Sequence, residues 1–366
     1  MKVAIVHDYI KEYGGAERVL EDLVKVFPNA TVYTCLYLPK FLGPHTDRFK
    51  KIKIKTSFFQ NIPFREKLIS PLRILSPFAF KSFDFSDYDV VIVSQTGAYF
   101  PNTIRKKNAT HITYTHTPPR YLYGYATSRE WKKNPLMRIF GEVANHFLRM
   151  IDYYASKNVD YFICNSYETK ARIKKFYREE AMVIYPPVDI KTSKAVKKED
   201  FYLAGGRLAR AKGMDIIVKA FAENGKPLKI FGKGFSGYGQ EIVSMSKPNI
   251  EFLGEVDDSE KLELMGRAKA FVFASYDEDF GITPVEAMGQ GTPVIAFKSG
   301  GVKETVVDGK TGVFYSPNTP EALNSEIEKF EKKRISSKSC TAQAKKFSSV
   351  RFKTEIKEFV NSVVKK

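Results

Sequence analysis

The sequence has few cysteines and no long apolar run. Its 366 residues include only three cysteines, Cys35, Cys164 and Cys340, too few and too far apart for a disulfide framework or a cysteine-rich zinc site. No apolar segment reaches about 18 residues, so we expect no membrane-spanning helix. The sequence also lacks the Gly-x-Ser-x-Gly, Walker and His-Glu-x-x-His motifs. It therefore gives no support for a serine hydrolase elbow, a P-loop nucleotide site or a zinc metalloprotease. The opening run at 2–7 predicts a strand, being too short for a signal peptide, and we expect a cytoplasmic protein.

Positive charge is in clear excess. Lys and Arg number 59 against 41 Asp and Glu, which gives a net charge of +18. The segment 40–81 alone holds ten basic and two acidic residues. A surface this basic favours anionic partners such as nucleic acid, acidic lipid or phosphorylated ligands. At 366 residues the chain is long enough for roughly two domains. Its 43% of hydrophobic residues is typical of a folded protein that can bury a full core.

Short β-branched runs alternate with longer amphipathic runs along the whole chain. This alternation predicts an α/β fold of parallel sheets with crossover helices, built as two Rossmann-like domains facing a cleft. The pattern restarts after Pro186-Pro187, so we expect domains at 1–187 and 188–347, and a helix at about 348–366 that packs back on the first. The expected strands are 2–7, 31–35, 89–94, 110–115, 159–164, 181–185, 201–204, 227–231, 250–253, 270–273, 293–297 and 311–314. The expected helices of the first half are 15–27, 134–157 and 166–178.

The first strand of the second half is followed by a glycine-rich basic turn, Gly205-Gly206-Arg207-Leu208-Ala209-Arg210-Ala211-Lys212-Gly213. Arg207 and Lys212 flank the carboxyl end of that strand, where α/β folds bind ligands. Two cations beside glycines and a helix start suit a diphosphate, although a solvated basic turn would carry the same residues.

The run from Tyr276 to Gly289 places two carboxylates around a glycine turn. Glu278 should lie on the loop, and Glu286 about one turn inside the following helix. The backbone amides of Gly281, Ile282 and Thr283 would face an anion at the helix N-terminus. Asp277 and Asp279 also form an Asp-x-Asp pair, but we expect no metal, because the nearby cations could neutralise a diphosphate.

Two features of the first half could contribute to a site. Gly14-Gly15 follows the first strand and opens a helix, where backbone can approach an anion, although a tight turn is an equal interpretation. His116 ends a strand-like run before Pro118-Pro119, and a binding role and a structural role are about equally supported.

Basic residues alternate with phenylalanines in 40–81. This pattern suits contact with an anionic membrane, and it would also suit single-stranded nucleic acid or a solvated face over core aromatics. The residues are Phe41, Phe49, Lys50, Lys51, Lys53, Lys55, Phe58, Phe59, Phe64, Arg65, Lys67, Arg73, Phe78, Phe80 and Lys81.

Taken together, these motifs resemble glycosyltransferase family 4, retaining enzymes of the GT-B fold. The Glu278–Glu286 pair is the most specific mark, and His116-Thr117-Pro118-Pro119-Arg120-Tyr121 is similar to bacterial O-antigen and exopolysaccharide mannosyltransferases of that family. The resemblance implies that His116 and Glu278 contact the donor sugar as catalytic residues. It assigns the diphosphate to Arg207 and Lys212 and the ribose to Glu286, and brings Gly14-Gly15 near the sugar or diphosphate.

The resemblance implies transfer of a sugar, with mannose from GDP-mannose favoured, to a lipid-linked saccharide or polysaccharide precursor in cell-surface glycan synthesis, with no cofactor. We expect the acceptor to be a polyprenyl-linked saccharide. The first domain would bind the acceptor and the second the donor. We expect peripheral association with the inner face of the cell membrane through 40–81, and no nucleic-acid partner. Two other functions remain open at this point: a non-catalytic nucleotide-sugar-binding protein, and a basic nucleic-acid-binding protein.

Overall fold

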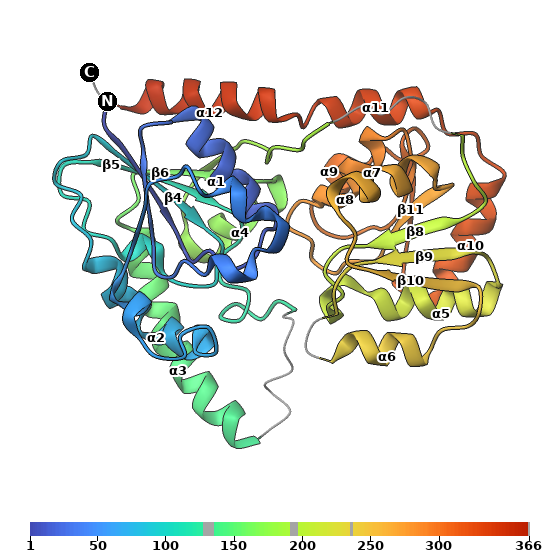
Figure 1. The fold of residues 1–366 in the computed structure, drawn as a ribbon, viewed down its shortest axis with the longest axis horizontal. Helices are drawn as coiled ribbons and strands as arrows, with labels where there is room; N and C mark the ends of the chain where they lie inside the picture. Colours follow the sequence, from blue (N-terminus) through green and yellow to red (C-terminus); the bar gives the residue numbers. More distant parts are fainter. Residues whose placement is uncertain (127–134, 191–196, 235–236, 365–366) are drawn as a thin grey trace. The chain divides into compact units, whose positions relative to one another are not determined.

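A computed structural model describes residues 1–126, 135–190, 197–234 and 237–364 (Figure 1). Residues 1–125, 135–187 and 349–364 form one compact unit, called unit 1, and the described residues of 188–348 form unit 2. Both units are parallel α/β structures of the Rossmann type, as the sequence predicts. No helix among the described residues has the length and apolar character needed to cross a membrane.

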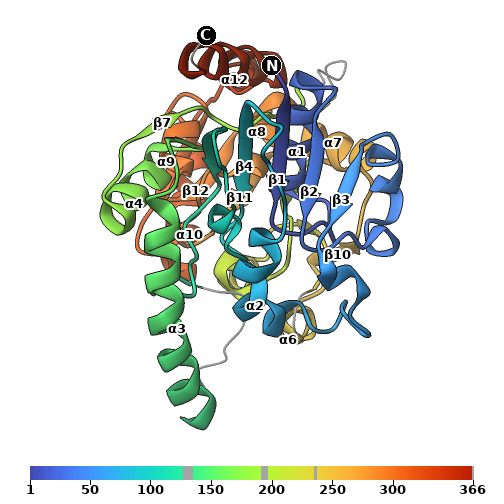
Figure 2. The ribbon, with the colours of Figure 1, turned by 90° about the vertical axis from the view of Figure 1, so that its left-hand side faces the viewer.

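Unit 1 is built on a seven-stranded parallel sheet with strand order β3-β2-β1-β4-β5-β6-β7 (Figure 2). The strands are β1 (Val3–His7), β2 (Thr31–Thr34), β3 (Ile54–Thr56), β4 (Val90–Gln95), β5 (Thr110–Thr115), β6 (Tyr161–Cys164) and β7 (Ala181–Val183). Its helices are α1 (Gly15–Val26), α2 (Ile69–Lys81), α3 (Pro135–Ser156), α4 (Tyr167–Tyr177) and α12 (Ser349–Val363).

Strand β1 is buried on both faces of this sheet. Val3 and Ile5 pack in one apolar cluster with side chains of α1 and α12, whereas Ala4 and Val6 pack in another with side chains of α2. Such double burial explains why β1 is a continuous apolar run rather than an alternating one.

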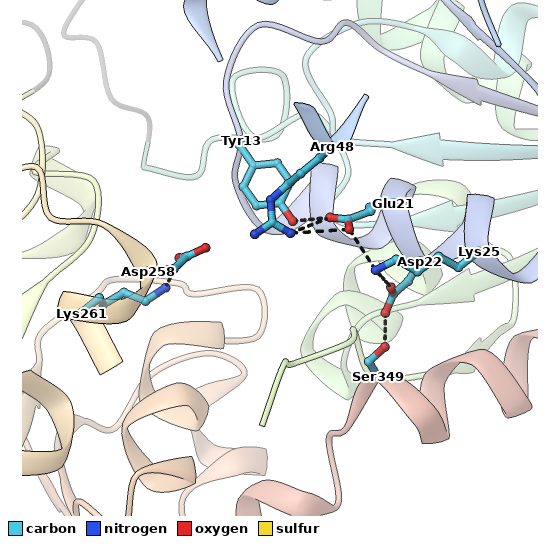
Figure 3. Close-up of polar contacts among 8 residues, drawn as sticks. All are labelled: Tyr13, Glu21, Asp22, Lys25, Arg48, Asp258, Lys261 and Ser349. Atoms are coloured by element: carbon cyan, nitrogen blue, oxygen red, sulfur yellow. Dashed lines mark hydrogen bonds and ion pairs between the residues drawn. The ribbon is translucent and has the colours of Figure 1, made fainter. Parts of the chain in front are cut away.

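The last helix, α12, is part of unit 1, although about 160 residues of unit 2 precede it in the chain. Phe352, Ile356 and Val360 are buried in the cluster that contains the apolar face of α1. At its first residue, the Ser349 hydroxyl donates to Asp22 of α1 (Figure 3). The expected helix near 348–364 therefore does pack on the first unit.

Unit 2 contains a six-stranded parallel sheet with strand order β10-β9-β8-β11-β12-β13. The strands are β8 (Tyr202–Gly205), β9 (Leu228–Phe231), β10 (Ile250–Gly254), β11 (Ala270–Phe273), β12 (Val294–Phe297) and β13 (Gly312–Tyr315). The helices are α5 (Met214–Asn224), α6 (Tyr238–Ser244), α7 (Asp258–Arg267), α8 (Ile282–Gly289), α9 (Val302–Thr305), α10 (Pro320–Glu331) and α11 (Ser337–Lys345).

Sequence patterns miss strand β3 and helix α2, which both lie inside the basic segment 40–81. Strand β3 is only three residues long and lies among lysines, so it has no clear alternation. Helix α2 carries Pro77 in its interior, and an internal proline normally argues against a helix. Burial of Leu72, Ala79 and Phe80 against the sheet stabilises α2 despite that proline.

Candidate functional site

The strand order of unit 2 reverses direction between β8 and β11, which are neighbours in the sheet. In open α/β sheets, ligands bind at the carboxyl ends of the strands beside such a switch point. Two loops meet there: 206–213 after β8 and 274–281 after β11. The backbone N–H of Tyr276 donates to the carbonyl of Ala211 at 2.9 Å, which joins the two loops directly.

Lys212 and Glu278, predicted separately from sequence, are in contact at this point. Lys212 Nζ lies 2.6 Å from Glu278 Oε2, and the Ser275 hydroxyl donates to the same oxygen at 2.5 Å. The Glu278 side chain is 14% exposed and that of Lys212 is 35% exposed. A cation and a carboxylate are thus held together at the rim of the sheet, within reach of a ligand.

A glycine is required where the two loops approach most closely. Gly213 precedes α5 with φ of 61°, and a Cβ atom there would lie 2.3 Å from the carbonyl oxygen of Ala274. Gly281 has φ of 90° and directly precedes α8, whose first residues are Ile282 and Thr283. An ordinary side chain at either position would be strained, so both glycines fix the geometry of the loops that carry Lys212 and Glu278.

Arg207 lies on the exposed surface directly after Gly206. A Cβ atom built on Gly206 would lie 4.0 Å from Thr283 Oγ1, so the turn that carries Arg207 is next to the start of α8. Asp277 has its backbone N–H bonded to Ser299 Oγ at 3.2 Å. Among the described residues, no group of three or more His, Cys, Asp or Glu side chains is placed to hold a metal ion.

Glu286 lies one turn inside α8, as its spacing predicts, and it is 6% exposed. Its Oε1 is 3.1 Å from Nζ of Lys261, a residue of α7. Lys261 also contacts Asp258 Oδ1 at 3.0 Å (Figure 3). This second cation holds the Glu286 carboxylate in place, and the sequence motifs did not single it out.

In unit 1 the strand order reverses between β1 and β4, and the polar residues gather at the same relative place. His7 ends β1, Ser94 lies in β4, and His116 directly follows β5. Ser94 Oγ is 3.0 Å from His7 Nδ1 and 2.9 Å from His116 Nε2. His7 Nε2 is in turn 3.7 Å from Glu17 Oε1. These side chains form a polar chain that ends at His116, in which the step from Glu17 to His7 is an electrostatic contact and not a hydrogen bond.

The His116 ring is neutral in this setting. Burial, with a smaller contribution from the nearby His7, lowers the pKa of His116 to about 3. Its backbone is also fixed, because the His116 N–H donates to the Gln95 carbonyl at 2.9 Å and its own carbonyl accepts from Asn165 at 2.9 Å. Fixed and neutral, His116 is suited to hydrogen bonding with a hydroxyl.

The turn at Gly14-Gly15 is capped by its own helix. The Gly14 N–H donates to Glu17 Oε2 at 2.9 Å, so this amide is already engaged with a carboxylate. Beside the turn, Glu21 accepts from the Tyr13 hydroxyl at 2.5 Å and from Arg48 at 3.2 Å (Figure 3). Burial opposes ionisation of Glu21, but hydrogen bonds from Tyr13 and Lys25 lower its pKa overall.

Asp8, the residue after β1, is a further buried group that sequence motifs missed. Its Oδ2 accepts from the Thr96 hydroxyl at 2.6 Å and from the N–H groups of Ala98 and Tyr99 at 3.0 Å. Burial raises the pKa of Asp8 despite these bonds. Asp8 therefore fixes the loop that follows β4, beside Ser94.

The phenylalanines of the basic segment 40–81 divide into two groups. Phe49, Phe59 and Phe80 are core residues with at most 1% exposure, so for them the interpretation as core aromatics is correct. At least half of the surface of each remaining ring, Phe41, Phe58, Phe64 and Phe78, is exposed. Among the cations, Arg73 donates to the Ala98 carbonyl at 2.9 Å and Arg48 to Glu21, so both have partners within unit 1.

Comparison with known proteins gives a consistent result over nearly the whole chain. The family model "Glycosyltransferase Family 4" matches residues 13–192, and the model "Glycosyl transferases group 1" matches residues 187–347. The alpha-1,3/1,6-mannosyltransferase ALG2 of Dictyostelium discoideum is 25% identical, with 100% of this chain and 98% of the relative covered.

Two solved structures resemble the fold of the whole chain. HepE from Anabaena, crystallised in complex with UDP, has a TM-score of 0.72 at 20% identity, with 99% of this chain and 100% of that chain covered. Sucrose-phosphate synthase from Thermosynechococcus elongatus has a TM-score of 0.74 at 18% identity, with 99% of both chains covered.

Proposed function

Because this chain is a glycosyltransferase of the family 4 type with the GT-B fold, we propose that it transfers mannose from GDP-mannose, with retention, to a polyprenyl-linked saccharide used in cell-surface glycan synthesis. The observation that carries the proposal is the pairing of Lys212 with Glu278 at the switch point of unit 2. Mannose is favoured because ALG2, a mannosyltransferase by name, is similar over the whole chain.

The positions of Lys212 and Glu278 suit adjacent parts of one donor. Negative charge develops on the nucleotide diphosphate as its bond to the sugar breaks, and a fixed cation stabilises that charge in the transition state. Lys212 would take this role together with Arg207 and the amides that begin α8. Glu278, 2.6 Å from Lys212, would hold hydroxyls of the sugar bonded to that diphosphate.

Glu286 would accept hydrogen bonds from the ribose hydroxyls of the nucleotide. Its burial and its contact with Lys261 fix the carboxylate before a ligand arrives, which reduces the entropy lost on binding. We propose in addition that Gly14, Gly15 and His116 of unit 1 contribute to binding the donor sugar, as the family resemblance implies, although the Gly14 N–H already donates to Glu17. Since Glu278 is held by both Lys212 and Ser275, attack by the acceptor hydroxyl from the front face is favoured over a covalent intermediate on this carboxylate.

The choice of donor can be tested by thermal unfolding of the purified chain with GDP, UDP and ADP sugars. Binding to the folded state alone raises the melting temperature, by an amount that grows with the logarithm of the ligand concentration divided by Kd. GDP-mannose should give the largest rise. A larger rise with a UDP or ADP sugar would overturn the choice of GDP-mannose, and no rise with any of them would overturn donor binding.

Metal is not part of the proposed chemistry. Lys212, Arg207 and the amides at the start of α8 together supply the positive charge that a divalent ion would otherwise bring. Transfer measured in excess EDTA should therefore equal transfer without it. Loss of transfer that manganese or magnesium restores would instead make Asp277 and Asp279 ligands.

We propose that the enzyme acts at the cytoplasmic face of the cell membrane. Exposed lysines of the segment 40–81, among them Lys50, Lys51 and Lys53, would attract anionic lipid, with about 1 kcal/mol from each cation near the surface. An acceptor anchored by a polyprenyl chain would then be within reach while it stays in the bilayer.

A further inference from the structure

Helix α3 presents an apolar stripe to solvent. Its packed face carries Leu148 and Ala155, while large apolar side chains line the opposite face. Phe140 is 72% exposed and Phe147 is 58% exposed, values far above those of core rings. The stripe consists of Ile139, Phe140, Val143, Phe147, Met150 and Tyr154, spaced so that they share one side of the helix.

Helix α2 also exposes apolar side chains. Both α2 and α3 contact the short 3₁₀ turn Pro101–Thr103, and both belong to unit 1. Ile74, Leu75 and Phe78 of α2 are each about half exposed or more. Large exposed apolar side chains gathered on two helices of one unit are a feature of interaction surfaces rather than of free protein surface.

Exposed cations lie on or next to the same two helices. Lys67 precedes α2, Lys81 ends it, and Arg138 lies in the first turn of α3. Apolar and aromatic side chains with basic residues beside them are the composition of helices that lie in the interface of an anionic bilayer. A net charge of +18 opposes the close approach of a second copy, but it favours an anionic surface.

We propose that the stripe on α3, together with the exposed apolar residues of α2, inserts into the interface of an anionic phospholipid bilayer. Helix α3 then lies along the membrane plane, with its rings in the headgroup region and its opposite face on unit 1. This surface is separate from the lysines of 40–55, and it does not depend on which sugar is transferred.

Vesicle sedimentation tests the proposal with the double variant Phe140→Ser/Phe147→Ser. Loss of two inserted rings should lower the partition coefficient onto vesicles with phosphatidylglycerol by about 30-fold. The matched control is Val243→Ser/Val350→Ser, which removes two exposed apolar side chains outside α2 and α3 and should bind as the native chain does. Circular dichroism would verify that each variant is folded.

Three results would overturn this role of α3: unchanged vesicle binding of the double variant, an equal loss in the control, or a native dimer that the double variant converts to monomer. Replacement of Lys50, Lys51, Lys53 and Lys55 with serine tests the attraction by the basic segment separately. That change should leave the contribution of the rings in place and make the remaining binding less sensitive to salt, because screening acts on charge and not on apolar burial.

A second inference concerns the polar chain of unit 1, and it rests on the proposed contact of His116 with the sugar. The Ser94 hydroxyl has one proton to donate and stands between two ring nitrogens. The Glu17 carboxylate, 3.7 Å from His7 Nε2, favours a proton on that nitrogen. His7 Nδ1 then accepts from Ser94, and Ser94 accepts from His116 Nε2–H.

We infer that Glu17, His7 and Ser94 are positioning residues that hold His116 in its Nε2–H tautomer, with Nδ1 left as a hydrogen-bond acceptor. In this state His116 accepts a hydrogen bond from a sugar hydroxyl rather than donating one. Glu17 therefore acts on the sugar contact through two other side chains, although it also caps the Gly14 amide.

Nitrogen-15 spectra of histidine-labelled protein at pH 7 show which ring nitrogen of His116 carries the proton, and so test the inference without any activity assay. The chain has five histidines, and the His116→Asn variant assigns the relevant signals. His116 should show a protonated Nε2 and an unprotonated Nδ1, and Ser94→Ala should remove that preference. Transfer by Ser94→Ala should fall about 10-fold with unchanged affinity for GDP. A protonated Nδ1 in the native chain would overturn the inference, whether or not the chain transfers sugar.

Discussion

Replacing Lys212 with alanine should lower the rate of sugar transfer by roughly 30- to 1000-fold while the chain stays folded. A positioned cation that acts on the leaving diphosphate is worth about 2–4 kcal/mol in the transition state. Lys212 is one-third exposed, and Glu278 keeps its hydrogen bond from Ser275 when Lys212 is removed, so the cost to stability is small. The measurement is kcat/KM with donor and acceptor. Arg207→Ala should act in the same direction.

The matched control for this change is Lys229→Ala. Lys229 lies in β9 of the same sheet, is 30% exposed, and pairs with Glu251 at 3.0 Å, so the change removes a similarly exposed, paired lysine outside the switch-point loops. Its kcat/KM should be close to that of the native chain. Near-native turnover by both Lys212→Ala and Arg207→Ala would show that the diphosphate binds elsewhere.

Substitution of the two carboxylates of unit 2 should show which one contacts the nucleotide and which one contacts the sugar. Glu286→Gln should weaken the binding of free GDP by about 10- to 150-fold, because charge-assisted hydrogen bonds to the ribose contribute about 1.5–3 kcal/mol. Lys261 keeps Asp258 as a partner in this variant, so its charge is not left isolated. Glu278→Gln should instead reduce transfer while the affinity for GDP stays near native.

Calorimetry with GDP and steady-state rates with the complete donor provide both quantities. The decisive feature is the contrast between the two variants. If GDP affinity fell in step with turnover in Glu278→Gln, this residue would contact the nucleotide rather than the sugar.

Sequence patterns predict the architecture well because both sheets are parallel and buried. Strands such as β1 and β11, covered on both faces, must be short apolar runs, and such runs are visible in a sequence. The start of α8 is equally visible, since Gly281 before Ile282 and Pro284 leaves few other local structures. The spacing alone therefore places Glu278 on a loop and Glu286 inside a helix.

Partners that come from distant parts of the chain could not be predicted in this way. Lys261 is one of many lysines in the chain, and only the packing of α7 against α8 brings it to Glu286. Ser94 is likewise an ordinary strand residue until β4 lies between β1 and β5 and its hydroxyl meets two histidines. The sequence carries the spacing of the apolar residues of α3, but only the structure shows that this face is uncovered.

The central claim is that this chain transfers a sugar from a nucleotide donor to a lipid-linked acceptor. The most direct measurement is mass spectrometry of polyprenyl-linked saccharides after incubation with purified protein and GDP-mannose. The account predicts an acceptor heavier by one hexose, with one GDP released for each acceptor modified, and formation of both products roughly 30- to 1000-fold more slowly by Lys212→Ala. An unmodified acceptor with every GDP, UDP and ADP sugar tried, or equal product from Lys212→Ala, would contradict it.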